Sequence, residues 1–98
     1  MKVVWSPLAL DKIRQQAHYI ARDDRRAAGR WIEDVFAAVE PLAGLPRSGR
    51  IVPELQDPDT REIIHDGYRI IYRIEAKQIS ILTVRHSRQR LTSGDLEG

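Results

Sequence analysis

The stretch that decides the fold runs from Tyr68 to Arg90 and reads YRIIYRIEAKQISILTVRHSRQR. It contains two runs of alternating apolar and polar residues, 68–75 and 79–86, which the short polar segment 76–78 separates. Alternation with a period of two is typical of strands that bury one face. The stretch therefore predicts an antiparallel hairpin, and the hairpin ends in a cluster of positive charge whose role is the main functional question.

A third strand precedes this hairpin. Residues 60–65 form another short run rich in β-branched residues, and Asp66-Gly67 separates it from Tyr68. Asp and Gly tolerate the positive φ angles that a two-residue hairpin turn requires. The three strands are therefore expected to form an antiparallel meander.

The N-terminal half predicts one strand and two helices. Residues 2–5 form a short apolar strand, and Ser6-Pro7 is a typical helix start, because Ser caps the helix and Pro suits its first position. Apolar residues then recur every three or four positions as far as Arg22. Asp23-Asp24 begins a second helix, which should end near Glu40 or kink at the following proline.

Together these elements predict an α+β fold of order β-α-α-β-β-β. The helical hairpin should pack on one face of a small, mainly antiparallel sheet, with the first strand at an edge. The segment 45–60 should be a loop, and residues 1–98 should form one domain with a loose tail from about 92 to 98.

The hairpin register predicts which side chains share a face. With Glu75 opposite Ile79, Tyr72 lies opposite Leu82 and Arg73 opposite Ile81. The face toward the helices would then hold Ile70, Tyr72, Ile74, Leu82 and Val84. Arg69, Arg73 and Arg85 would share the other, open face, with Arg69 and Arg85 directly opposed. An acidic partner, or Glu62 on the neighbouring strand, would relieve this repulsion.

The composition limits the possible functions. The chain of 98 residues is 42% hydrophobic and 31% charged, which indicates a globular domain. Without cysteine it has no disulfide and no thiolate ligand, which fits a reducing cytosol. A net charge of +2 does not by itself indicate a nucleic-acid partner. No apolar run is long enough to span a membrane, and no signal peptide is expected at the N-terminus.

The histidines do not predict a metal or cofactor site. His18, His65 and His86 show no ligand spacing, so we expect no metal and no cofactor. His86 lies beside Ser87, but neighbouring residues on a strand point to opposite faces, which is a poor geometry for a nucleophile and its base. Two interpretations of His86 remain, a general acid or base and a polar strand end.

Several motifs, in this order, resemble the RelE/ParE toxin superfamily of bacterial type II toxin–antitoxin systems. They are WSPLALDKI, YIARD, LAGLPRSGR, PEL, REI, YRIIYRI and ILTVRHSRQ, and they extend from about Val3 to Leu91. The resemblance implies the β-α-α-β-β-β fold. It also implies one of two activities, because RelE-like members are ribosome-dependent mRNA endonucleases, whereas ParE-like members poison DNA gyrase.

The motifs favour the ParE-like class. RelE-like nucleases carry an arginine where this chain has Ile64, and the position of their second basic residue near the end of the last strand is Ser87. No tyrosine follows in the tail. The resemblance thus implies a gyrase inhibitor without catalytic residues of its own, which contacts its target through Arg85, His86, Arg88 and Arg90. The alternatives are a nuclease that uses Arg61, Arg85, His86 and Arg88, and a degenerate member or pure binding module.

The resemblance also implies a partner. A toxin of this superfamily is neutralised in the cytoplasm by a cognate antitoxin, here ParD-like, whose disordered C-terminal segment folds on the toxin. Its acidic side chains would meet Arg69, Arg73 and Arg85. Trp5 and Trp31 are candidate contact aromatics, with core packing as the alternative for each.

Overall fold

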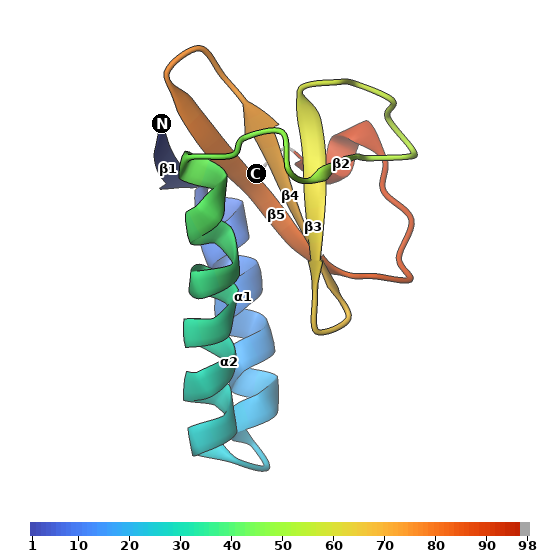
Figure 1. The fold of residues 1–98 in the computed structure, drawn as a ribbon. Coiled ribbons are helices and arrows are strands. Elements are labelled where there is room, and N and C mark those ends of the chain that lie inside the picture. The colour runs from blue at the N-terminus through green and yellow to red at the C-terminus, as the bar shows by residue number, and fades with distance from the viewer. Residues whose placement is uncertain (97–98) are drawn as a thin grey trace.

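The computed structural model describes residues 1–96 and contains a five-stranded sheet with a helical hairpin on one face (Figure 1). The elements are β1 (Lys2–Trp5), α1 (Pro7–Ala21), α2 (Arg25–Val39), the 3-10 turn η1 (Glu40–Ala43), β2 (Arg50–Ile51), β3 (Thr60–His65), β4 (Tyr68–Ile74), β5 (Gln78–His86) and the 3-10 turn η2 (Ser93–Leu96). The sheet order is β1-β5-β4-β3-β2, and β1 runs parallel to β5 at one edge. The predicted order is confirmed, except that the short strand β2 lies within the expected loop.

Each helix begins at the cap that the sequence predicts. Ser6 Oγ accepts the N–H of Ala9 at 3.0 Å and donates to the carbonyl of Leu82 at 2.9 Å, so this residue also joins the start of α1 to β5. The Asp24 carboxylate accepts the N–H groups of Arg26 and Ala27 at 2.9 and 3.1 Å. Capping satisfies backbone donors that have no partner inside the helix. Within residues 1–96, neither helix is long and apolar enough to cross a membrane.

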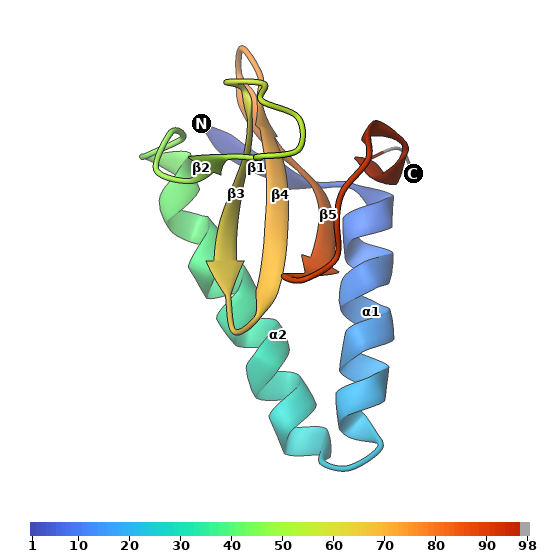
Figure 2. The ribbon, with the colours of Figure 1, turned by 90° about the vertical axis from the view of Figure 1, so that its right-hand side faces the viewer.

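Pro41 ends the second helix and does not kink it. α2 stops at Val39, and Pro41 lies in the first turn of η1, where its missing N–H costs nothing. The helical hairpin extends well beyond the sheet at its far end, where the turn between α1 and α2 lies (Figures 1 and 2).

The β4–β5 hairpin contains a bulge that the sequence does not predict. The first four pairs, from Tyr68 with His86 to Ile71 with Thr83, match the predicted register. Beyond them Tyr72 pairs with Ile81, so the predicted Tyr72–Leu82 and Arg73–Ile81 pairs are wrong, as is that of Glu75 with Ile79. On β5, the buried apolar residues that face the helices are Ile79, Ile81 and Val84. Their spacing of two and then three requires one extra residue, and a bulge supplies it.

The sheet is covered on both faces. The main core lies between the sheet and the helices, and its buried members are Ala9, Ile13, Ala17, Trp31, Val35, Val39, Leu42, Ile70, Tyr72, Ile79, Ile81 and Val84. A second cluster on the opposite face consists of Val52, Ile71 and Leu91, with Leu55, Leu82 and Leu96 packed against it. Leu82 therefore faces away from the helices, contrary to the prediction. In Figure 1 the loop before β3 and the C-terminal segment form a third layer beside the sheet.

The C-terminal segment is attached to the sheet over most of its length. Leu91 is buried, and within the expected loose tail Ser93–Leu96 forms the 3-10 turn η2. Asp95 accepts the N–H of Thr92 at 2.9 Å and pairs with Arg85 at 3.1 Å. The looseness expected for residues 92–98 therefore does not apply to this turn, and residues 97–98 lie outside the described part of the chain.

A buried tyrosine fixes the loop that follows the helices. Tyr72 is fully buried, donates its hydroxyl to the carbonyl of Pro46 at 2.7 Å and accepts the N–H of Gly49 at 3.0 Å. A Cβ atom added at Gly49 would lie 2.5 Å from the Tyr72 hydroxyl and 2.6 Å from the carbonyl oxygen of Glu62. Only glycine lets the loop approach both groups so closely.

Gly49→Ala should therefore lower the free energy of unfolding by roughly 1–3 kcal/mol, because either the loop or Tyr72 must shift. The matched control is Gly29→Ala in α2, where an added Cβ has no neighbour within 4 Å. That change should raise the free energy of unfolding by roughly 0.5–1 kcal/mol through helix propensity. Urea denaturation of both variants measures the difference. Equal effects of the two substitutions would show that the loop does not need its close approach.

Candidate functional site

The predicted basic face is organised around a buried ion-pair network. Arg69 is only 4% exposed, and its Nε donates to Glu62 at 2.7 Å. Its two terminal nitrogens donate to the two carboxylate oxygens of Glu54 at 2.7 and 2.8 Å, a bidentate arrangement. The prediction of an open surface that includes Arg69 is therefore wrong. Glu62 is the internal partner that the strand register allowed, and Glu54 comes from the loop before β3.

The same network holds the C-terminal segment in place. Glu54 also accepts the backbone N–H of Leu91 at 2.9 Å, and Arg69 donates to the carbonyl of Gln89 at 3.0 Å. One arginine on β4 thus joins the loop before β3, strand β3 and the segment after β5. Removing either partner would leave a buried charge without compensation, which is far more costly than losing a surface ion pair.

The network shifts the titration of Glu54. Hydrogen bonds from Arg69 are the main cause that lowers the pKa of Glu54 from 4.5 to about 2, with a smaller contribution from the backbone of Leu91. Because the folded form has the lower pKa, the unfolded chain binds more protons between the two values. The stabilisation from Glu54 is complete above about pH 4.5 and is lost as the pH falls toward 2.

Glu54→Gln should therefore destabilise the protein by an amount that depends on pH. Near neutral pH the loss should be on the order of 2–3 kcal/mol, and it should shrink as the pH is lowered toward 2. Asp11→Asn, which removes an exposed ion pair with Arg14, is the control and should change stability by less than about 0.5 kcal/mol at every pH. Urea titrations at several pH values measure both differences. A loss for Glu54→Gln that is the same at every pH would contradict the assignment.

Arg85 and Arg73 occupy different environments. Arg85 lies opposite Arg69 as predicted, but Asp95 neutralises it at 3.1 Å, and its side chain is 20% exposed. Its Nε atom is buried and has no hydrogen-bond partner among the described residues. Arg73 lies opposite Thr60 and is exposed. Of the three predicted arginines, only Arg73 therefore presents its side chain freely to solvent.

His86 lies at the exposed end of β5, beside α1. The Tyr68 ring packs edge-on against His86 and against Trp31, with ring centroids 5.8 and 5.4 Å apart. Burial is the main cause that raises the pKa of Tyr68 above its usual value. The Nδ1 atom of His86 accepts the backbone N–H of Arg88 at 3.3 Å. Arg88 and Arg90 are exposed in the segment that follows.

The residues of the nuclease alternative do not all come together. Arg61 donates to the carbonyls of Pro58, Gly49 and Arg47 at 2.9, 3.0 and 3.2 Å. Arg61 on β3 pairs with Tyr72 on β4, which pairs with Ile81 on β5. Arg61 is therefore level with Ile81, and Ile81 lies five residues from His86 along β5. Standard strand dimensions place Arg61 and His86 about 16 Å apart along the sheet and about 10 Å apart across it.

The two tryptophans have mainly core positions. Trp31 is 5% exposed, and Trp5 packs on Phe36 with ring centroids 4.6 Å apart. Trp31 belongs to the main core, and Trp5 packs against it. Trp5 remains partly exposed at the sheet edge, whereas Trp31 is not accessible to a partner.

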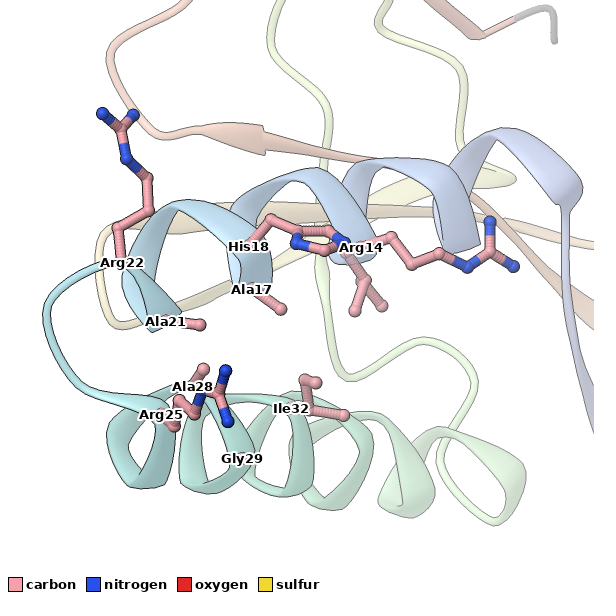
Figure 3. Close-up of a pocket in the computed structure, with 10 residues that line it drawn as sticks. Arg14, Ala17, His18, Ala21, Arg22, Arg25, Ala28, Gly29 and Ile32 are labelled. Carbon is pink, nitrogen blue, oxygen red and sulfur yellow. The ribbon is translucent and has the colours of Figure 1, made fainter.

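A groove that the sequence does not predict lies between the two helices. It has a volume of about 640 Å³, and its lining residues are Ile13, Arg14, Ala17, His18, Ala21, Arg22, Arg25, Ala28, Gly29 and Ile32. In Figure 3 the alanines of α1 point across the gap toward α2, and Arg14 and Arg22 extend at its two ends. The floor is small and apolar, and every titratable lining residue is basic. The cluster of small residues on both helices was the signal that could have revealed it.

The described residues do not form a metal site, because residues 1–96 contain no group of three or more His, Cys, Asp or Glu side chains that could hold a metal ion. The described residues present three charged or apolar surfaces. They are the groove between the helices, the exposed end of β5 and the Arg73 side of the sheet.

Comparison with known proteins decides the family. The family described as "ParE toxin of type II toxin-antitoxin system, parDE" has a model that matches residues 3–91. The chain belongs to this ParE toxin family. A protein of Sinorhizobium fredii (strain NBRC 101917 / NGR234), named "Putative toxin Y4kP", is 35% identical to this toxin over an alignment of 91 residues, and the alignment covers 91% of each chain.

Solved structures confirm the predicted fold of this ParE-family toxin. It superposes on a chain of the chromosomal ParDE toxin–antitoxin system from P. aeruginosa with a TM-score of 0.73 and 21% identity, over 88% of this chain and 95% of the other. A chain of the RelBE2 toxin–antitoxin complex from Mycobacterium tuberculosis gives a TM-score of 0.54 and 19% identity, over 87% and 95%. At these identities the likeness shows a common fold.

Proposed function

We propose that this ParE-family toxin inhibits DNA gyrase by binding it in the cytoplasm and that it cleaves no bond itself. The observation that carries the proposal is the separation of Arg61 from His86 within the sheet. A phosphodiester-cleaving site needs its acid, base and phosphate-binding groups within hydrogen-bond reach of one substrate. The ParE family membership supports the same conclusion.

The surroundings of His86 also support a binding role. Its Nδ1 atom accepts a backbone N–H, and no carboxylate of the described residues forms a hydrogen bond with the ring. A catalytic histidine usually has a partner that fixes its tautomer and orientation. Arg85 points to the other face of β5, where Asp95 neutralises it. On this proposal His86, Arg88 and Arg90, together with the exposed part of Arg85, contact the target.

The proposal predicts how the toxin behaves toward its two possible targets. Purified toxin should inhibit supercoiling by purified gyrase, and His86→Gln, which keeps size and hydrogen bonding, should retain that inhibition within about threefold. A nuclease that loses its general acid or base instead loses roughly 10²–10⁴-fold in rate. A supercoiling assay and a ribosome-dependent mRNA cleavage assay, run side by side, measure the two activities.

Two results would overturn this assignment. One is full supercoiling activity of gyrase at saturating toxin. The other is cleavage of mRNA on ribosomes that disappears in His86→Gln. Either result would favour the RelE-like alternative, and Arg85 and Arg88 would be the next residues to substitute.

We further infer that a ParD-like antitoxin neutralises the toxin by laying an acidic amphipathic helix in the groove between α1 and α2. The floor of alanines and Gly29 allows a third helix to approach closely. The basic lining residues Arg14, His18, Arg22 and Arg25 form a rim that complements carboxylates. Arg69 and Trp31 are buried and cannot contact an antitoxin on the protein surface. The predicted antitoxin-binding residues that remain exposed are Arg73, Trp5 and part of Arg85. The groove adds the apolar contact that these residues lack.

Reversing one charge on the rim tests the groove. Arg25→Glu should weaken the binding of the cognate antitoxin by roughly tenfold or more, because it places a like charge against the acidic helix. Arg30→Glu makes the same change on α2 outside the groove lining and should have less than about threefold effect. Titration calorimetry with the antitoxin's C-terminal segment measures both affinities. Equal losses of affinity in the two variants would indicate general electrostatic attraction and not binding in the groove.

A further inference from the structure

A second groove lies between α1 and the end of β5. It has a volume of about 400 Å³ and is lined by Lys12, Gln15, Gln16, Tyr19, Tyr68, Val84, Arg85, His86 and Gln89. Its origin is topological. β1 ends at Trp5, opposite Ile81, so the last part of β5 has no strand beside it on that edge. The side of α1 that carries Lys12 and Tyr19 faces this end of β5 instead.

The lining of this groove differs from that of the groove between the helices. It contains three basic side chains, three glutamines and two tyrosines, and it contains no carboxylate and only one aliphatic residue. A helix with an apolar stripe would find little to pack against here. Bases and phosphates suit this lining, because bases offer flat π faces and hydrogen-bonding edges, and phosphates pair with cations.

Most of these polar side chains have no partner among the described residues. Among residues 1–96, Lys12 forms no ion pair, and the side chains of Gln15, Gln16 and Tyr19 form no hydrogen bond. Tyr19 is 65% exposed, so one face of its ring is accessible to a ligand. These donors and this aromatic surface are therefore available without breaking any internal contact.

Arg85 lines the groove from β5, with its guanidinium directed to the opposite face of the strand. Its Nε atom is buried without a partner among the described residues, and its guanidinium pairs with Asp95. His86 stands beside it on the neighbouring face, with its Nδ1 atom already occupied by the backbone of Arg88.

We propose that this groove binds a nucleotide unit of single-stranded nucleic acid. Lys12 holds the phosphate, the ring of Tyr19 stacks on the base, and the glutamines contact its edge. The binding is recognition only, with no bond made or broken. It does not depend on gyrase being the target, because the groove, its charges and its free donors are features of the toxin alone.

The experiment measures fluorescence anisotropy of a fluorescein-labelled pentathymidylate with the intact toxin at several salt concentrations. Lys12→Gln should weaken binding by roughly threefold to tenfold and should lower the salt dependence by about 0.7 in the log–log slope, the value for one single-strand phosphate contact. The matched control is Lys77→Gln, the same charge change on the exposed turn between β4 and β5. It should change affinity by less than about twofold.

A second pair of variants tests the stacking contact. Tyr19→Ala should weaken binding by roughly fivefold or more, and Tyr19→Phe should restore it, because the ring and not the hydroxyl makes the contact. Thermal unfolding of each variant shows that the fold is intact. Tyr19 is exposed and makes no internal hydrogen bond, so no change in stability is expected.

Four outcomes would overturn the proposal. They are no binding of the oligonucleotide at low salt, equal losses for Lys12→Gln and Lys77→Gln, complete competition by polyglutamate of the same charge, and tighter binding of the corresponding duplex. The second outcome would mean diffuse attraction to a basic protein. The third would mean a site for acidic peptides, and the fourth would mean recognition of duplex geometry.

Discussion

The structure depends on the charge of Arg69. This arginine is buried on the face of the sheet that the helices leave uncovered, and the two carboxylates of Glu54 and Glu62 neutralise it. A buried charge is tolerated only with such partners. Because one partner comes from a neighbouring strand and the other from a loop, the network forces the loop and the C-terminal segment onto the sheet. The small second cluster around Ile71 and Leu91 then forms beneath them.

The sequence predicted the helical side of the molecule better than the other side. Capping residues, the Asp66-Gly67 turn and strict alternation are local features, so Ser6, Asp24 and the register from Tyr68 to Ile71 were predictable. The bulge at Leu82 was not, because its cause is the packing of Ile79, Ile81 and Val84 against helices distant in sequence. Local alternation contains no information about that packing.

The candidate site was harder to predict for the same reason. Three arginines on one face of the sheet look like an open basic surface until Glu54 and Glu62 are placed beside Arg69, and Asp95 beside Arg85. Glu62 follows from the strand register, but Glu54 and Asp95 come from irregular segments. The groove between the helices depends on small residues that, in the sequence, look like ordinary helix formers. Surfaces made by two elements together are recognised only when the elements have been positioned.

The extension of the helical hairpin beyond the sheet has a consequence for how this toxin can evolve. The far end of the groove lies between two helices that are joined there only by the turn at residues 22–24, away from the buried residues that determine stability (Figures 1 and 3). Side chains on this rim are free to change without disturbing the core. On the proposal that the antitoxin helix lies in this groove, a duplicated copy of the toxin can acquire a new partner through rim substitutions while its fold stays the same.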